Sequence, residues 1–228
     1  MKHFRDYLTE AKETGIHFEG NIDTSNCEKL ESLGNLKSVS GYLLLDNCIS
    51  LKNLPNDLQV GKSLDLDNCT ALTELPTGLQ IGGYLVLDNC TALESLPSSL
   101  NVDGSLFLRG CTSLQSLPND FSISGDLNLQ DCTALKSLPN SLDIDGNLFL
   151  SGCSSLKSLP RGLQVGENLF LTDCTALTEL PNDLLVVYRL DISGCSSLKT
   201  LPLDMKIGFI TGASKKLKEQ YKNKYIFK

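Results

Sequence analysis

The sequence predicts an α/β solenoid in which about nine coils of 21 residues stack on one another. The first observation is the spacing of the cysteines, each 21 residues after the last: Cys27, Cys48, Cys69, Cys90, Cys111, Cys132, Cys153, Cys174 and Cys195. The second is an apolar pattern that every coil repeats, as in "GYLVLDNCTALESLPSSLNV" from Gly83 to Val102. One such coil cannot bury its own apolar side chains, so the coils must stack.

The pattern inside one coil predicts a short strand followed by a turning segment. Leu85 and Leu87 alternate with Tyr84, Val86 and Asp88. This period of two residues is that of a strand whose leucines face the core. Val86 then points outward. Pro97 lacks a backbone donor and suits a segment outside the sheet, and the pair Gly82–Gly83 permits the bend into the next strand.

The unit G-x-L-x-L-x-x-C-x-x-L-x-x-L-P resembles leucine-rich repeats from about residue 20 to 207. That resemblance implies a horseshoe with a parallel β-sheet on its concave face and a mostly irregular convex side. "SGCSSLKSLP" at Ser151–Pro160 resembles the repeats of plant intracellular immune receptors, but the sequence contains nothing like their P-loop. "LPxxLxV" resembles repeats of injected bacterial effectors, and "LPTGLQIGGYLVL" resembles proteins of bacteria and large tailed phages.

We expect three parts: an N-terminal helix over 1–14, the solenoid over 15–207 and a C-terminal cap over 208–228. Terminal coils need such caps because one side of each is otherwise exposed. In the C-terminal cap, Ser214 is the predicted helix N-cap, with Leu217, Gln220 and Tyr221 on the inner face. The segment 225–227 then covers the last coil's edge.

The N-terminal "MKHFRDYLTEA" resembles the peptide that sends internal proteins into the heads of large tailed phages. The matching residues are Met1, Lys2, Phe4, Tyr7, Leu8, Glu10 and Ala11. The resemblance implies cleavage after Glu10, so that the mature chain begins at Ala11. The alternative is a capping helix, since Phe4, Tyr7, Leu8 and Ala11 share one helical face.

The even spacing of the cysteines favours buried thiols over disulfides or a metal site. Adjacent strands lie about 4.8 Å apart, which is wider than the separation of about 3.8 Å that bridged Cβ atoms need. No Cys-x-x-Cys pair offers metal ligands. Nine reduced thiols predict a reducing, cytoplasmic setting, with the virion or infected-cell cytoplasm as the phage alternative.

Composition narrows the choice of partner. The net charge of −7 argues against nucleic-acid binding by the body of the protein, although residues 214–228 carry six Lys and one Glu and could contact an acidic partner. No apolar run is long enough to span a bilayer. We find no catalytic constellation, no metal site and no cofactor motif. The Gly pairs precede strands rather than helices, so they are turns and not phosphate-binding loops. We therefore expect no enzyme activity.

The strand parity predicts which side chains face outward on the concave side. The central outward column reads Asp23, Leu44, Asp65, Val86, Phe107, Asn128, Phe149, Phe170 and Asp191. Its apolar members Leu44, Val86, Phe107, Phe149 and Phe170, together with Tyr84, are the candidate partner-binding residues, because exposed aromatics mark contact sites. The alternative for this column is drift among duplicated coils.

The next outward column stacks three carboxylates, Asp46, Asp67 and Asp88, which repel one another. They predict a site for a cation or a basic partner. The alternative is that they are solvated surface residues.

The function that these observations favour is a non-enzymatic module that binds protein through its concave face. The alternatives are a phage internal head protein packaged in the virion, and a purely structural repeat module without a ligand.

Overall fold

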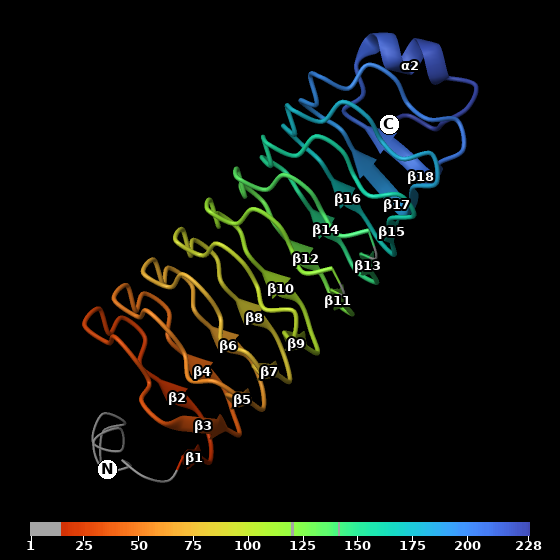
Figure 1. Cartoon of the computed structure of the whole chain (residues 1–228). Helices are drawn as coiled ribbons and strands as arrows, with labels where there is room; N and C mark the ends of the chain where they lie inside the picture. The colour runs from red at the N-terminus through yellow and green to blue at the C-terminus, as the bar shows by residue number, and fades with distance from the viewer. Residues whose placement is uncertain (1–14, 120, 141) are drawn as a thin grey trace.

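The computed structural model describes residues 15–119, 121–140 and 142–228, and it is an elongated stack of about nine parallel coils. The first coil and the C-terminal helix α2 (Lys215–Tyr221) lie at opposite ends of the stack (Figure 1). The proposed N-terminal helix over 1–14, with the cleavage site between Glu10 and Ala11, lies outside the described residues and stays a prediction.

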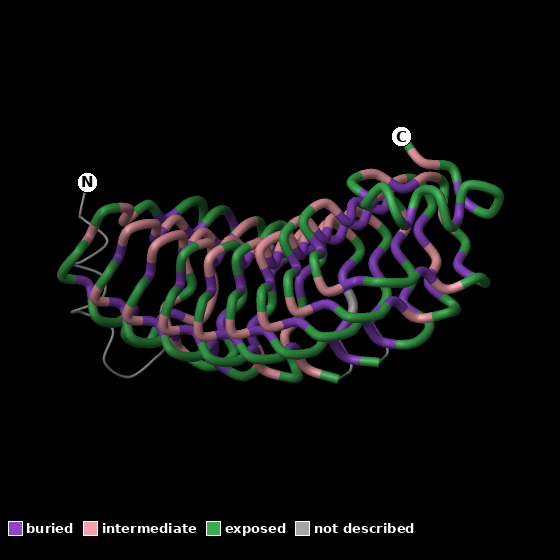
Figure 2. Tube along the Cα trace, turned by 90° about the horizontal axis from the view of Figure 1, so that it is seen from above, coloured by how far each residue is buried: buried purple, intermediate pink, exposed green. Residues whose placement is uncertain are grey.

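Each coil contributes one strand to a first row, with Leu or Ile at its buried position. The strands are β2 (Ile22–Asp23), β4 (Leu43–Leu44), β6 (Leu64–Asp65), β8 (Leu85–Val86), β10 (Leu106–Phe107), β12 (Leu127–Asn128), β14 (Leu148–Phe149) and β16 (Leu169–Phe170). Neighbours pair in parallel without slippage, so Leu64 pairs with Leu85 and Leu85 with Leu106. The buried leucines therefore form one continuous core along the stack, seen as buried segments that recur in every coil (Figure 2).

A second row of strands runs beside the first. It consists of β1 (Ile16–Phe18), β3 (Leu36–Val39), β5 (Gln59–Val60), β7 (Gln80–Ile81), β9 (Asn101–Val102), β11 (Ser122–Ile123), β13 (Asp143–Ile144) and β15 (Gln164–Val165). The sequence predicted irregular structure for this part of the coil. This row forms two ladders, one that ends at β9 and one that begins at β11, and within each ladder the Val or Ile of one coil pairs in register with that of the next, as Val60 does with Ile81. Two residues are too few to show a period of 2, which is why the pattern missed these strands.

Glycine allows the close approach of backbones between the two rows. A Cβ added to Gly82 would lie 2.5 Å from the carbonyl oxygen of Gly61 in the preceding coil. A side chain is therefore excluded at Gly82, and most coils that have a side chain at this position have glycine at the next one, as in Asp103–Gly104.

The two rows join in the last coils. Strand β17 (Leu185–Asp191) pairs with β15 through its first residues and with β16 through its last, so it belongs to both rows. Strand β18 (Lys206–Thr211) then pairs with β17 in parallel. The boundary that we placed at 207 falls inside β18.

The C-terminal segment closes that end of the stack. The Ser214 hydroxyl accepts a hydrogen bond from the Leu217 amide at 3.3 Å, which confirms the predicted N-cap, and both Leu217 and Tyr221 are buried. Gln220 is exposed, so its predicted inward position is wrong, because a seven-residue helix turns only two of its side chains onto the last coil. The tail returns to the edge of β18, where Ile210 donates to the carbonyl of Ile226 at 2.8 Å.

The cysteines line the core and bond to the preceding coil. Eight of the nine are buried, whereas Cys27 in the first coil is half-buried. Each of the eight buried thiols donates a hydrogen bond to the carbonyl 24 residues earlier, at 3.0–3.3 Å. Burial raises the pKa of Cys90 and Cys132 to about 12, so these thiols stay protonated at neutral pH.

We expect thiol labelling of the native protein to separate one cysteine from the other eight. With a small maleimide at neutral pH, Cys27 should react at least ~10-fold faster than the rest, because the buried thiols are inaccessible and protonated. The measurement is mass spectrometry of labelled peptides over time, and denatured protein without reductant should titrate nine free thiols. Fast labelling of Cys111 or Cys132 in the native protein would contradict the buried arrangement.

The residue just before each cysteine has a left-handed backbone in all nine coils. This column reads Asn26, Asn47, Asn68, Asn89, Gly110, Asp131, Gly152, Asp173 and Gly194, with φ between 58° and 78°. Only Gly, Asn and Asp adopt this conformation at low cost. Asn47 and Asn68 each donate a side-chain hydrogen bond to the asparagine one coil earlier, at 3.2 and 3.1 Å, whereas the Asn89 amide donates to Asp67 at 3.3 Å.

Candidate binding face

The outward side chains of the first strand row form three parallel columns, which we call the strand face. The first column contains Tyr42 and Tyr84, the central column contains the predicted apolar residues, and the third contains the aspartates. Leu44, Val86, Phe107, Phe149 and Phe170 are half-buried rather than core residues, and Tyr84 is 56% exposed. The structure thus places the candidate residues on one face.

Two phenylalanines of adjacent coils stack on each other. The rings of Phe149 and Phe170 lie with centroids 4.9 Å apart and planes only 5° from parallel. Their strands pair in register, so the ring separation equals the strand spacing. The pair forms an apolar ledge, a surface to which another apolar side chain can dock.

An ion pair between a half-buried arginine and a buried aspartate in the next coil holds the arginine beside this ledge. The Arg189 guanidinium carbon lies 5.2 Å from the Phe170 ring centroid, and the group pairs with the Asp191 carboxylate. Arg189 Nε also donates to the hydroxyl of Thr211 at 2.9 Å. These contacts hold the guanidinium over the Phe170 ring, at one end of the stacked pair.

Asp191 is the one buried charged residue among those that the structure describes, with 5% of its surface exposed. Burial acts to raise the pKa of Asp191, but hydrogen bonds from Ser193 and the charge of Arg189 outweigh it and hold that pKa below its usual value. The carboxylate therefore stays ionised at neutral pH and keeps Arg189 in place beside Phe170.

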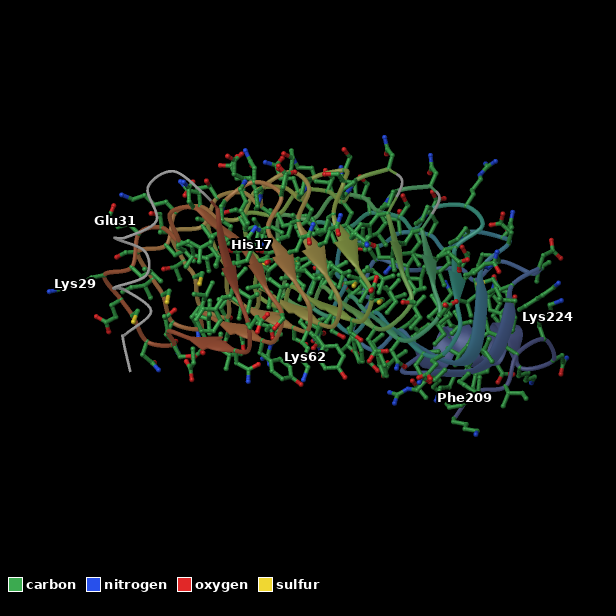
Figure 3. All side chains as sticks on the ribbon, turned by 90° about the horizontal axis from the view of Figure 1, so that it is seen from below. His17, Lys29, Glu31, Lys62, Phe209 and Lys224 are labelled. Carbon is green, nitrogen blue, oxygen red and sulfur yellow. The ribbon has the colours of Figure 1, made fainter. Side chains whose placement is uncertain are left out.

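A second aromatic contact lies toward the middle of the face. Tyr84 and Phe107 meet edge to face, with centroids 6.3 Å apart. Nearer the N-terminal end, Lys62 Nζ lies 4.9 Å from the Tyr42 ring centroid. Figure 3 shows Lys62 in this half of the molecule and Phe209, which is half-buried under Lys228, at the far end.

The predicted aspartate column is half-buried, and neighbouring amides contact it. Asn47 and Asn68 each donate a side-chain hydrogen bond to the preceding aspartate, Asp46 and Asp67, at 3.1 and 3.2 Å. Asp88 accepts from the backbone of Arg109 at 2.8 Å. No group of three His, Cys, Asp or Glu residues within 15–119, 121–140 and 142–228 is arranged to hold a metal ion.

The carboxylates of these coils disfavour one another's charge. Burial, together with the nearby charge of Asp67, raises the pKa of Asp88. The pKa of Asp65 in the central column is raised in the same way, by burial and then by Asp46 and Asp67. The N-terminal half of the strand face is thus a surface on which a positive charge would be favourable.

Sequence reasoning missed two exposed apolar residues that come just before Arg189. Val187 and Tyr188, 47% and 57% exposed, occupy the positions where other coils have their bend between the two rows. The signal was present as "LLVVYRLD", the one coil in which a continuous strand replaces the glycine-containing bend. Arg189 was missed because a cation over a ring follows from the register of two coils, not from either sequence alone.

The described residues also contain a hollow of about 300 Å³ between the last coil and α2, lined by Cys195, Leu198 and Leu217 among others. Burial raises the pKa of Cys195 to about 11, so its thiol is protonated at neutral pH. A protonated thiol is a poor nucleophile, and this hollow therefore does not offer an activated cysteine.

A solved leucine-rich repeat domain has a structural likeness to this chain. No family model matches the chain, and no curated protein matches it. The leucine-rich repeat domain of the type III effector XCV3220 (XopL) matches with 16% sequence identity over 91% of this chain and 79% of that chain, at a TM-score of 0.29. The fold assignment rests on this chain's own coils, cysteine register and strand pairing. None of the described helices has the length and apolar character that crossing a bilayer requires.

Proposed function

We propose that this chain is a non-enzymatic module that binds a protein partner through the strand face. The observation that carries the proposal is the stacked pair Phe149 and Phe170 with Arg189 fixed at its edge. Aromatic and arginine side chains dominate the binding energy of protein interfaces. The free thiols favour a reducing compartment for this interaction.

The packaged head protein remains the second candidate, and it is favoured by the sequence of residues 1–11 alone. The two candidates are compatible, because a packaged protein also uses a surface to contact other proteins. A purely structural module, in contrast, does not require half-buried and exposed aromatics to gather on one face.

We expect the triple variant Phe107→Ser, Phe149→Ser, Phe170→Ser to fold and to lose ligand capture. Ligands are first selected by the wild-type chain from a random peptide library displayed on yeast, and binding of the selected peptides is then measured. Because the three side chains lie outside the core, circular dichroism should be unchanged and the Tm should fall only modestly.

The matched control replaces three exposed apolar residues on other surfaces, namely Ile49→Ser, Leu203→Ser and Ile226→Ser. This variant should bind the selected peptides as the wild type does. A triple Phe variant that folds and still binds them would place the binding site elsewhere. If that variant unfolds, the assignment of these residues to the outside is wrong.

A further inference from the structure

The strand face differs in charge and in aromatic content between its two ends. In the first four coils its three columns carry five carboxylates and no base: Asp23, Asp46, Asp65, Asp67 and Asp88. In the last five coils, Arg109 and Arg189 offset Asp126 and Asp191, and the three phenylalanines lie there. One end is therefore anionic, and the other is neutral and aromatic.

The carboxylates at the anionic end are not neutralised within the described chain. Among the residues that the structure describes, Asp46, Asp65, Asp67 and Asp88 make no ion pair within 4.0 Å. Arg109, the nearest base of the face, points to Asp131 at 3.7 Å, and Lys62 lies over the Tyr42 ring. Burial, and then the charges of neighbouring aspartates, raise the pKa of Asp65 and of Asp88.

The distance between the two ends sets the length of a partner that contacts both. Asp65 and Phe170 lie in the same column, five coils apart. At about 4.8 Å per coil, five coils span about 24 Å, which about seven residues of extended chain cover at about 3.3 Å each.

We infer that the partner segment carries a cluster of Lys or Arg residues and, about seven extended residues away, an apolar end. The basic cluster lies over Asp46, Asp67 and Asp88, and the apolar end lies on the ledge of Phe149 and Phe170. This inference rests on the proposed function, since it specifies the partner of the same face. Complementary charge gives such a complex its orientation along the stack and a high association rate.

The test uses fluorescent synthetic peptides and the full chain. The probe joins about six alternating Lys and Arg residues to a Leu-Trp-Leu end through a spacer of about three Gly and Ser residues, so that the centres of the two blocks lie about seven residues apart. The comparison peptides are the basic block alone, the apolar block alone, and a peptide of the same composition with Leu-Trp-Leu in the middle of the basic block. We expect the probe to bind at least ~10-fold tighter than the other three peptides, because only it reaches both ends with the matching block.

Two sets of variants separate the two ends of the face. Asp46→Asn, Asp67→Asn, Asp88→Asn together keep the hydrogen-bond acceptors and should reduce the affinity of the probe to that of the apolar block. Phe149→Ser with Phe170→Ser should reduce it to that of the basic block. The control Glu74→Gln, Glu94→Gln, Glu179→Gln changes the net charge equally on exposed positions off the face and should have little effect. The Tm of each variant verifies folding.

The outcomes distinguish this inference from the proposed function. If the Asn variant binds the probe as the wild type does while the Phe variant does not, the inference fails and the proposed function stands. If neither variant changes the binding of the probe, both fail. If none of the four peptides binds, the inference alone fails, because the proposed function is tested with the selected peptides. Self-association of the chain at low salt that the Asn variant abolishes would assign the anionic end to the basic tail of a second copy and overturn the inference.

Discussion

Leu85→Ala should lower the free energy of unfolding by about 3–5 kcal/mol, the cost of removing a fully buried leucine from a packed core. Leu85 has no exposed surface, and it pairs with Leu64 on one side and Leu106 on the other. Each coil of a solenoid contacts only its neighbours, so a cavity here weakens both interfaces of the coil. Thermal unfolding followed by circular dichroism should show a Tm lower by about 10 °C.

The control for this prediction is the next residue in the same strand. Val86→Ala also removes apolar atoms, but Val86 points to the strand face and is half-buried, so its cost should stay below about 1 kcal/mol. Equal losses for the two variants would show that the inward and outward sides of β8 have been exchanged.

Leu217→Asp should detach the C-terminal cap. Leu217 is 3% exposed, and a carboxylate in its place cannot stay against the apolar last coil. A helix of seven residues is not stable without that packing. The loss of the cap uncovers the edge of β18, so the variant should associate at concentrations where the wild type does not. Sedimentation velocity over a series of concentrations measures this association.

Limited digestion with trypsin is an independent measurement of whether the C-terminal cap detaches in Leu217→Asp. The segment from Ser214 to Lys228 contains six lysines, and their cleavage should become at least ~10-fold faster when the cap detaches. Gln220→Asp introduces the same charge on the same helix at an exposed position and should leave both association and cleavage unchanged. Unchanged cleavage in Leu217→Asp would mean that the helix is held by other contacts.

Much of the strand face could be predicted from sequence because one simple rule governs it. Within each strand of the first row, neighbouring residues point to opposite sides, and the constant 21-residue step keeps every column aligned. Leu85 could therefore be assigned to the core, and Phe149 could be placed beside Phe170, from spacing alone. The buried thiols follow from the same register.

The remaining features depend on relations between coils that a single coil does not reveal. The strand at Gln80–Ile81 exists because its neighbours offer matching backbone groups, and two residues carry no periodic signal. The position of Arg189 over Phe170 requires the buried Asp191, whose burial no local pattern indicates. The exposure of Gln220 likewise depends on how α2 meets the last coil.

The residue in the left-handed position before each cysteine is Asn, Asp or Gly. This residue limits which coil can come next. An asparagine can stack on an asparagine because its amide both donates and accepts, but an aspartate cannot donate to another aspartate. The Asp131 carboxylate leans over the next coil, where a Cβ on Gly152 would lie 2.3 Å from its Oδ1. An aspartate coil is therefore followed by a glycine coil, here and again at Asp173 and Gly194.

The sequence keeps this alternation beyond the column itself. The coils with aspartate continue "CTAL", whereas those with glycine continue "CTSL" or "CSSL". In the C-terminal half, the unit that could be duplicated, deleted or exchanged without a mismatch is thus a pair of coils, 42 residues long. In the N-terminal half, where Asn47 and Asn68 donate to the asparagine one coil earlier, it is a single coil. This protein can consequently be lengthened or shortened by single coils in its N-terminal half and by pairs of coils in its C-terminal half.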